Sequence, residues 1–130
     1  MLTTEAIVLI SHFDVRPGHL HLIRGTWASI ILKLEGAKPG TAGYLGYLTD
    51  GGAELTIVQV FPDGRAMEAH LTGTDGGIRA AYEHIEPAGW EVYGNPPDEI
   101  LAQLGESALA AGVDLVIQRQ PLGGFLRLGA

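Results

Sequence analysis

The side chains best suited to acid–base or metal chemistry are the five histidines, because the 130-residue chain has no cysteine. It therefore has no thiolate ligand, cysteine nucleophile or disulfide framework. His12, Asp14, His19 and His21 are close in sequence and suggest a site of two histidines and one carboxylate. Helical residues two apart, however, point about 200° away from each other. Surface and capping roles are the commoner alternative, and we predict no metal site.

His70 has the better position for catalysis. It follows Met67 by three positions in a segment predicted to be a helix, so both side chains face the same side. A histidine with the ordinary pKa of ~6.5 can accept a proton from a phenolic substrate at neutral pH. The commoner role of such a residue is a helix-end histidine bonded to a carbonyl. His70 is our candidate base, with that structural role as the alternative.

Three further residues are candidates for ligand contacts: Tyr44, Gln59 and Trp90. Gln59 interrupts the apolar side of a predicted strand at 53–61, so its amide needs a partner if that side is covered. A ligand, a water molecule or the Tyr44 hydroxyl would each serve. The alternative for the two aromatic residues is the core, where most aromatic side chains of a domain this size lie.

Composition excludes several classes of function. The chain has 8 basic and 15 acidic residues, a net charge of -7 and a pI near 5.0. Nucleic acids and anionic membranes require clustered positive charge, which the scattered Lys and Arg residues do not provide. No apolar run approaches the roughly 20 residues that span a bilayer. We also find no secretory signal pattern at the start of the chain, so the expected location is cytoplasmic.

Periodicity and turn residues predict the secondary structure. Ala6 to Ile10 is apolar on both alternating faces, which indicates a strand covered on both sides. Asp50 and Gly51 favour a tight hairpin turn, Asp63 is suited to cap a helix, and Asn95 with the two following prolines resembles a helix start. We predict strands at 5–13, 42–49, 53–61, 90–94 and 113–117, helices at 20–35, 65–71 and from Asn95 to about Gly112, and a helical piece with Ile78, Tyr82 and Ile85 on one side.

This order, β-α-β-β-α-β followed by α-β, predicts an α+β fold. The first six elements match the ferredoxin-like arrangement. We expect a single domain over 1–130, with a ferredoxin-like core at 1–94 and a C-terminal helix, strand and tail at 95–130. The mean hydropathy of +0.18 is high for a soluble chain. Together with the doubly apolar first strand, it suggests apolar surface that a second copy covers.

The segment from Pro17 to Leu71 resembles the antibiotic biosynthesis monooxygenase-like group of dimeric α+β barrels. The matching motifs are Val15-x-Pro17-Gly18 before the first helix, Ala42-Gly43-Tyr44 in strand 2, Ile57 to Phe61 in strand 3, and Pro62-Asp63-Gly64-Arg65-Ala66-Met67-Glu68-Ala69-His70-Leu71. The resemblance implies a homodimer in which two sheets face each other to close a barrel. It also implies a pocket between the sheet and the helices of each protomer.

The resemblance leaves two kinds of chemistry open, because some members oxidise phenols or quinols without a cofactor and others degrade haem. Haem degradation fits poorly: the aromatic residue ending strand 3 is usually Trp but is Phe61 here, strand 1 lacks the expected Asn, and no motif marks His84 as a ligand. We expect His84 to be solvent-exposed beside Glu83 and Glu86.

Two functional hypotheses follow. The first is a cofactor-independent monooxygenase-like enzyme acting on a small aromatic or quinol-type molecule, with His70 as the base and no cofactor. Such chemistry needs a dry pocket, a base and hydrogen bonds to the substrate anion, because the electron-rich substrate itself reduces oxygen. The second is a non-catalytic dimeric barrel that binds a small hydrophobic ligand or serves a stress response.

Overall fold

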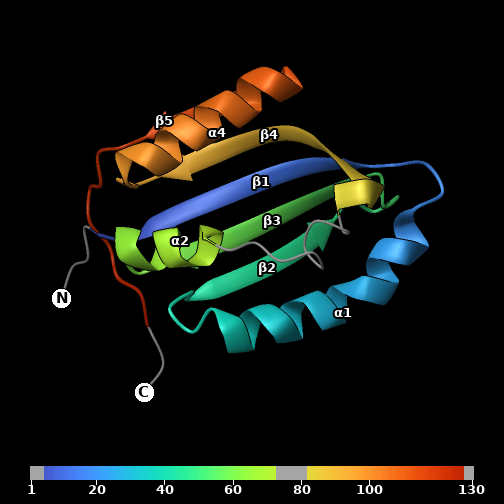
Figure 1. The fold of residues 1–130 in the computed structure, drawn as a ribbon, viewed down its shortest axis with the longest axis horizontal. Coiled ribbons are helices and arrows are strands. Elements are labelled where there is room, and N and C mark those ends of the chain that lie inside the picture. The colour runs from blue at the N-terminus through green and yellow to red at the C-terminus, as the bar shows by residue number, and fades with distance from the viewer. Residues whose placement is uncertain (1–4, 73–81, 128–130) are drawn as a thin grey trace.

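The computed structural model describes residues 5–72 and 82–127, which form a curved sheet with helices on one side (Figure 1). The elements in chain order are β1 (Ile7–Val15), α1 (Leu20–Ala37), β2 (Gly43–Leu48), β3 (Glu54–Phe61), α2 (Gly64–Leu71), a 3-10 turn η1 (Tyr82–His84), β4 (Ile85–Tyr93), α4 (Asp98–Ala111) and β5 (Leu115–Gln118).

The sheet has the strand order β2-β3-β1-β4-β5. β1 lies in the centre and pairs antiparallel with both β3 and β4, and β2 pairs antiparallel with β3. These four strands have the ferredoxin-like arrangement. β5 adds a fifth strand parallel to β4. The predicted α+β fold with an added C-terminal helix and strand is therefore confirmed.

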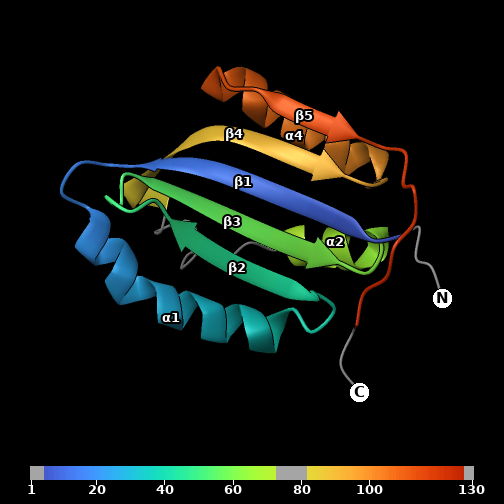
Figure 2. The same cartoon turned by 180° about the vertical axis from the view of Figure 1, so that it is seen from behind.

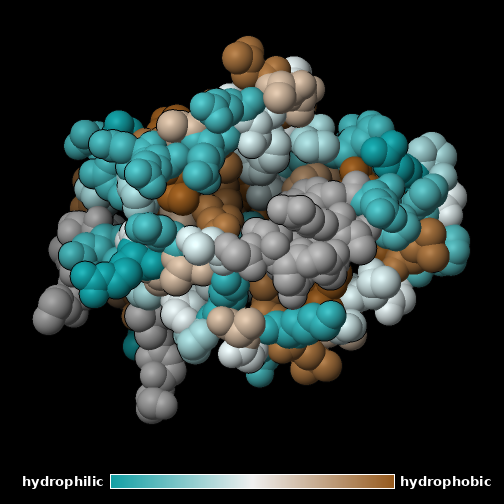
Figure 3. Space-filling view, viewed as in Figure 1, coloured by the Kyte–Doolittle hydropathy of each residue, from teal (hydrophilic) through white to brown (hydrophobic). Residues whose placement is uncertain are grey.

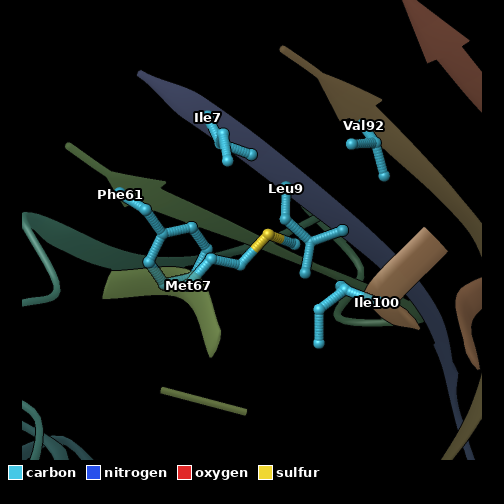
Figure 4. Packing of buried hydrophobic residues seen from close by; sticks show 6 residues of the cluster. All are labelled: Ile7, Leu9, Phe61, Met67, Val92 and Ile100. Atoms are coloured by element: carbon cyan, nitrogen blue, oxygen red, sulfur yellow. The ribbon is translucent and has the colours of Figure 1, made fainter. Parts of the chain in front are cut away.

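The core lies between the sheet and the helices. Ile7 and Leu9 of β1 and Val92 of β4 point to the same side, where they face Met67 of α2 and Ile100 of α4 (Figure 4). A second cluster packs α1 against the other end of the sheet and contains Phe13, Ile23, Leu55, Ile57 and Ile85. Burial of these side chains fixes which face of each strand points toward the helices.

The opposite face of the sheet carries no helix among the described residues (Figure 2). Its central rows are register pairs of β1 and β3: Val8 with Val60, Ile10 with Val58, and His12 with Thr56. The sequence predicted that β1 is covered on both sides. Among the described residues, Ile7 and Leu9 are buried on the helix side, and Val8 and Ile10 are half-buried on the other side. Within residues 5–72 and 82–127, no helix covers this second apolar face.

Apolar side chains also reach the surface elsewhere. In Figure 3 they appear along the lower border, where α1 lies. The C-terminal tail exposes Leu122, Phe125 and Leu126. Within residues 5–72 and 82–127, no helix combines the length and the apolar character that crossing a bilayer requires.

The fourth strand begins earlier than predicted. The sequence indicated a strand at 90–94 and placed Ile85 on a helix, but β4 starts at Ile85. Pro87 and Gly89 hide the strand pattern, and they lie where the register with β1 shifts between His12 and Phe13. Tyr82 lies in the 3-10 turn, and Ile78 with the glycine-rich stretch at 73–77 falls outside the described residues.

The structure confirms one of the predicted helix caps but not the other, and it shifts the predicted hairpin turn. Asp63 caps α2 as expected, because its Oδ1 accepts a hydrogen bond of 2.8 Å from the amide of Ala66. Asn95 does not cap α4, because the N-cap residue of this helix is Pro97. The Asn95 side chain instead accepts hydrogen bonds from Arg119. In the hairpin turn the positive φ of 73° occurs at Gly52, one residue later than predicted.

Candidate functional site

His70 lies in the last turn of α2, and the Asp63 cap fixes where that helix begins. Met67 and His70 are the buried residues of α2, so both face the sheet as their spacing predicted. Only 8% of His70 is exposed. The predicted helix at 65–71 therefore places the candidate base at the interior of the protein.

Three side chains hold the imidazole of His70. Thr41 Oγ1 lies 2.7 Å from His70 Nδ1. The Tyr44 ring is stacked on the imidazole with a centroid separation of 5.7 Å, and the Phe61 ring meets it edge-on at 5.3 Å. Among the described residues Nε2 has no hydrogen-bond partner. When Nδ1–H donates to Thr41, the lone pair on Nε2 is free to accept a proton.

The surroundings of His70 keep it neutral. Burial and, to a smaller degree, the positive charge of Lys38 lower the pKa of His70 from 6.5 to about 4. Lys38 Nζ donates hydrogen bonds to the carbonyls of Ala69 and Thr72, at 2.9 and 2.8 Å. Lys38 thus joins the end of α1 to the end of α2 and places its charge near the imidazole.

A cavity of about 260 Å³ opens beside this group. Its wall includes Tyr44 and His70, together with Thr41, Lys38 and Glu35. The remaining lining residues come from α1 and from the segment that leads into β2: Ile31, Leu34, Pro39, Ala42 and Gly43. The cavity therefore combines an apolar wall, two aromatic or imidazole rings and a few polar groups, as small-molecule sites do.

Trp27 of α1 extends the row of rings. Its ring is stacked on Tyr44 at 5.9 Å, with an angle of 30° between the planes. Gly46 makes room for it, because a Cβ atom there would lie 2.3 Å from Trp27 Cζ2. The three rings of Trp27, Tyr44 and His70 thus form a continuous stack beside the cavity.

Gln59 is buried on the helix-facing side of β3, as its position in the alternation predicted. It is the register partner of Tyr44 on β2 and of Leu9 on β1. Its Oε1 is buried without a hydrogen-bond partner among the described residues. Gln59 is not one of the residues that line the cavity, so it neighbours the site through Tyr44.

Trp90 has a different environment from the other candidates. It packs against the cluster of Ile7, Leu9, Phe61, Met67, Val92 and Ile100 and is not a lining residue of the cavity. The structure therefore brings together Tyr44, His70 and, as a neighbour, Gln59. Trp90 lies in the core between the sheet and α4.

His12, His19 and His84 lie in polar pairs outside the cavity, and His21 is exposed. His12 Nε2 is 2.5 Å from Glu91 Oε2, and His12 Nδ1 is 3.2 Å from Thr56 Oγ1. His84 is half-buried and not solvent-exposed as predicted, and its Nδ1 lies 3.0 Å from Nδ1 of His19. The reason is the 3-10 turn, where the His84 carbonyl binds the amide of Arg16 and brings the two loops together. No group of three or more metal-ligating side chains occurs in the described ranges.

Thr41 and Lys38 were not among the residues singled out from the sequence. Both lie at the end of α1, around a Pro39-Gly40 break that marked only the end of a helix. Their role depends on the contact between this loop and α2, about thirty positions later, for which the sequence gives no local signal. The spacing of Met67 and His70 was the signal that did identify the buried face.

No family model matches the chain, and no curated protein matches it. Solved structures do share its fold. MupZ from Pseudomonas fluorescens is 18% identical, with a TM-score of 0.69 over 97% of this chain and 99% of that one.

Two further structures match the fold over a smaller part of the chain. SnoaB, a cofactor-independent oxygenase from Streptomyces nogalater, is 12% identical, with a TM-score of 0.58 over 72% of this chain and 95% of that one. A candidate antibiotic biosynthesis monooxygenase from Bacteroides thetaiotaomicron is 15% identical, with a TM-score of 0.51 over 64% and 85%. The resemblance to this group is confirmed at the level of the fold.

Proposed function

We propose that this protein binds a small aromatic molecule of the phenol or quinol type beside His70 and oxidises it with O2 without a cofactor. The observation that carries the proposal is the state of His70: a buried, neutral imidazole at a cavity wall, with Nδ1 held by Thr41 and Nε2 free. A neutral imidazole whose Nδ1 donates to a fixed partner can accept a proton at Nε2.

The reaction requires one proton acceptor at its start. His70 Nε2 takes the proton of a substrate hydroxyl, and the resulting anion transfers an electron to O2. The superoxide and the substrate radical combine at a ring carbon to give a peroxide anion, which takes the proton back from His70 Nε2. The O–O bond of this hydroperoxide then breaks as the hydrogen on the same carbon is lost, which releases water and leaves a carbonyl. One oxygen atom enters the product, the other leaves as water, and the substrate supplies both electrons.

The low pKa of His70 applies to the empty cavity, where a charged imidazole would have no partner. A substrate anion formed next to the ring offsets this penalty, because an opposite charge nearby favours the imidazolium. Proton transfer and anion formation are therefore coupled in this site.

The rings at the cavity wall favour the binding of an aromatic ligand. Tyr44 and His70 both line the cavity with their rings, and aromatic rings in offset-stacked or edge-on contact are favoured by about 1 kcal/mol beyond their burial. The fold shared with SnoaB, described as a cofactor-independent oxygenase, is consistent with this chemistry.

We also propose that the protein is a homodimer joined through the open sheet face. Val8, Ile10, Val58 and Val60 form its apolar centre, and Leu45 and Tyr47 of β2 are more than half exposed there. Sedimentation at micromolar concentration tests this. We expect a dimer for the natural chain and a monomer for Val58→Glu, with Leu32→Glu on the exposed side of α1 as control. If the natural chain sediments as a monomer, the proposed dimeric barrel is wrong.

An oxygen-uptake screen against a panel of phenols and quinols tests the function. Turnover supports the enzyme. Binding of the same molecules without oxygen uptake selects the alternative, a non-catalytic barrel that holds a small hydrophobic ligand or serves a stress response. The observation favouring that alternative is that the His70 ring is packed against Tyr44 and Phe61, and its hydrogen bond among the described residues is to Thr41 and not to a carboxylate.

A further inference from the structure

We propose that Lys38 makes the cavity selective for ligands that bind as anions, so that acidic phenols and enols are held in preference to neutral aromatic molecules of the same shape. This inference rests on the proposed site beside His70 and names the ligand class that the site prefers.

The position of Lys38 supports this role. Its side chain is part of the cavity wall, and Nζ donates to the carbonyls of Ala69 and Thr72, which flank the turn that carries His70. These two bonds hold the ammonium group in one place, whereas a free lysine side chain would lose more entropy on binding a ligand. An ammonium group has three donors, so one N–H remains for a ligand.

The charge of Lys38 acts at the place a ligand would occupy. It disfavours a second positive charge on the neighbouring His70, and by the same interaction it favours a negative charge on a molecule lying against that ring. A hydrogen bond to a charged group contributes more than one between neutral groups. The cavity should therefore lower the pKa of a bound phenol.

One group opposes Lys38. Glu35 lines the same cavity three residues earlier on α1, and its carboxylate repels an anion. Glu35 is exposed, so solvent screens its charge, while Lys38 is half-buried. Tyr44 and Thr41 supply uncharged hydroxyl groups to the site. Of the described residues that line this cavity, Lys38 is thus the only cation.

Equilibrium binding of 4-nitrophenol, whose anion absorbs visible light, tests the proposal without any turnover. We expect its apparent pKa to fall on binding to the natural protein and to return toward the free value in Lys38→Met. The affinity for the anion should drop by about tenfold in that variant, with little change for nitrobenzene. Lys38→Arg should restore anion binding, and Glu35→Gln should strengthen it.

Two results would overturn the proposal. One is a bound 4-nitrophenol whose pKa does not change. The other is an equal loss of 4-nitrophenol and nitrobenzene binding in Lys38→Met while Lys38→Arg behaves like the natural protein, which would mean that Lys38 only holds the loop. Anion selectivity without oxygen uptake would leave this inference standing and remove the oxygenase proposal.

Discussion

Thr41 Oγ1 lies 2.7 Å from Nδ1 of His70, and this contact fixes the imidazole that faces the cavity. It joins the loop after α1 to the last turn of α2. Because Nδ1 is occupied, a ligand in the cavity meets Nε2. Nδ1 of this buried histidine is thus held by the protein, and Nε2 is left to accept a proton from a ligand.

Replacing Thr41 with valine keeps the shape of the side chain and removes its hydroxyl. We expect a loss of about 1 kcal/mol in the free energy of unfolding and a mixture of His70 tautomers in the ¹⁵N NMR spectrum. Thr26→Val is the control, since Thr26 bonds only to carbonyls within α1. An unchanged His70 spectrum in Thr41→Val would mean that the hydroxyl does not orient the ring.

The lowered pKa of His70 predicts how stability depends on pH. The unfolded chain, with a His pKa near 6.5, binds more protons than the folded state, with about 4. His70 therefore contributes no penalty above pH 6.5, and the free energy of unfolding falls as the pH drops from 6.5 to 4. The shift corresponds to roughly 3 kcal/mol at most.

Urea unfolding across this pH range measures the effect. The fall in the free energy of unfolding that His70 causes below pH 6.5 should be missing in His70→Gln. It should be present in His21→Gln, because His21 is exposed. If His70→Gln retains the full slope between pH 6.5 and 4, other groups cause the acid sensitivity.

Gly46 is expected to be intolerant of a side chain. An alanine Cβ would lie 2.3 and 2.6 Å from two atoms of the Trp27 ring, so the ring must leave its stack on Tyr44. We expect Gly46→Ala to cost about 1–3 kcal/mol and to change tryptophan fluorescence. Gly25→Ala in α1 meets open space and should stabilise by about 0.5–1 kcal/mol. Equal effects of the two substitutions would contradict the packing described.

Gln59 is buried with an unpaired oxygen, which is unfavourable in the ligand-free protein. Gln59→Leu should therefore raise the free energy of unfolding by about 1 kcal/mol, as thermal or urea unfolding would measure. Gln103→Leu, on the exposed side of α4, should change it little. A marked loss of stability in Gln59→Leu would instead reveal a hydrogen bond that the amide needs.

Local patterns predicted most of the fold. An apolar run identified β1, a strand-like run after the Asp50-Gly51 turn identified β3, the Asp63 cap marked the start of α2, and α4 ends at Gly112 as predicted. The start of β4 could not be predicted, because Pro87 and Gly89 are unusual in a strand and are tolerated only next to the register shift with β1.

The site was predictable in part. His70, Tyr44 and Gln59 were identified because each is a polar or aromatic residue on a face that had to be buried. Thr41, Lys38 and the His19–His84 pair depend on contacts between segments far apart in sequence. Residue type alone could not show whether Trp90 contacts a ligand or packs in the core, because a large aromatic side chain suits both places. In the structure Trp90 packs against the core.

Oxygen uptake by the natural protein and by His70→Gln, compared on one phenol or quinol, tests the central claim most directly. We expect one O2 to be consumed for each carbonyl formed, and we expect His70→Gln to lose most of this rate while His21→Gln retains it. Turnover that continues unchanged in His70→Gln would show that His70 is not the base.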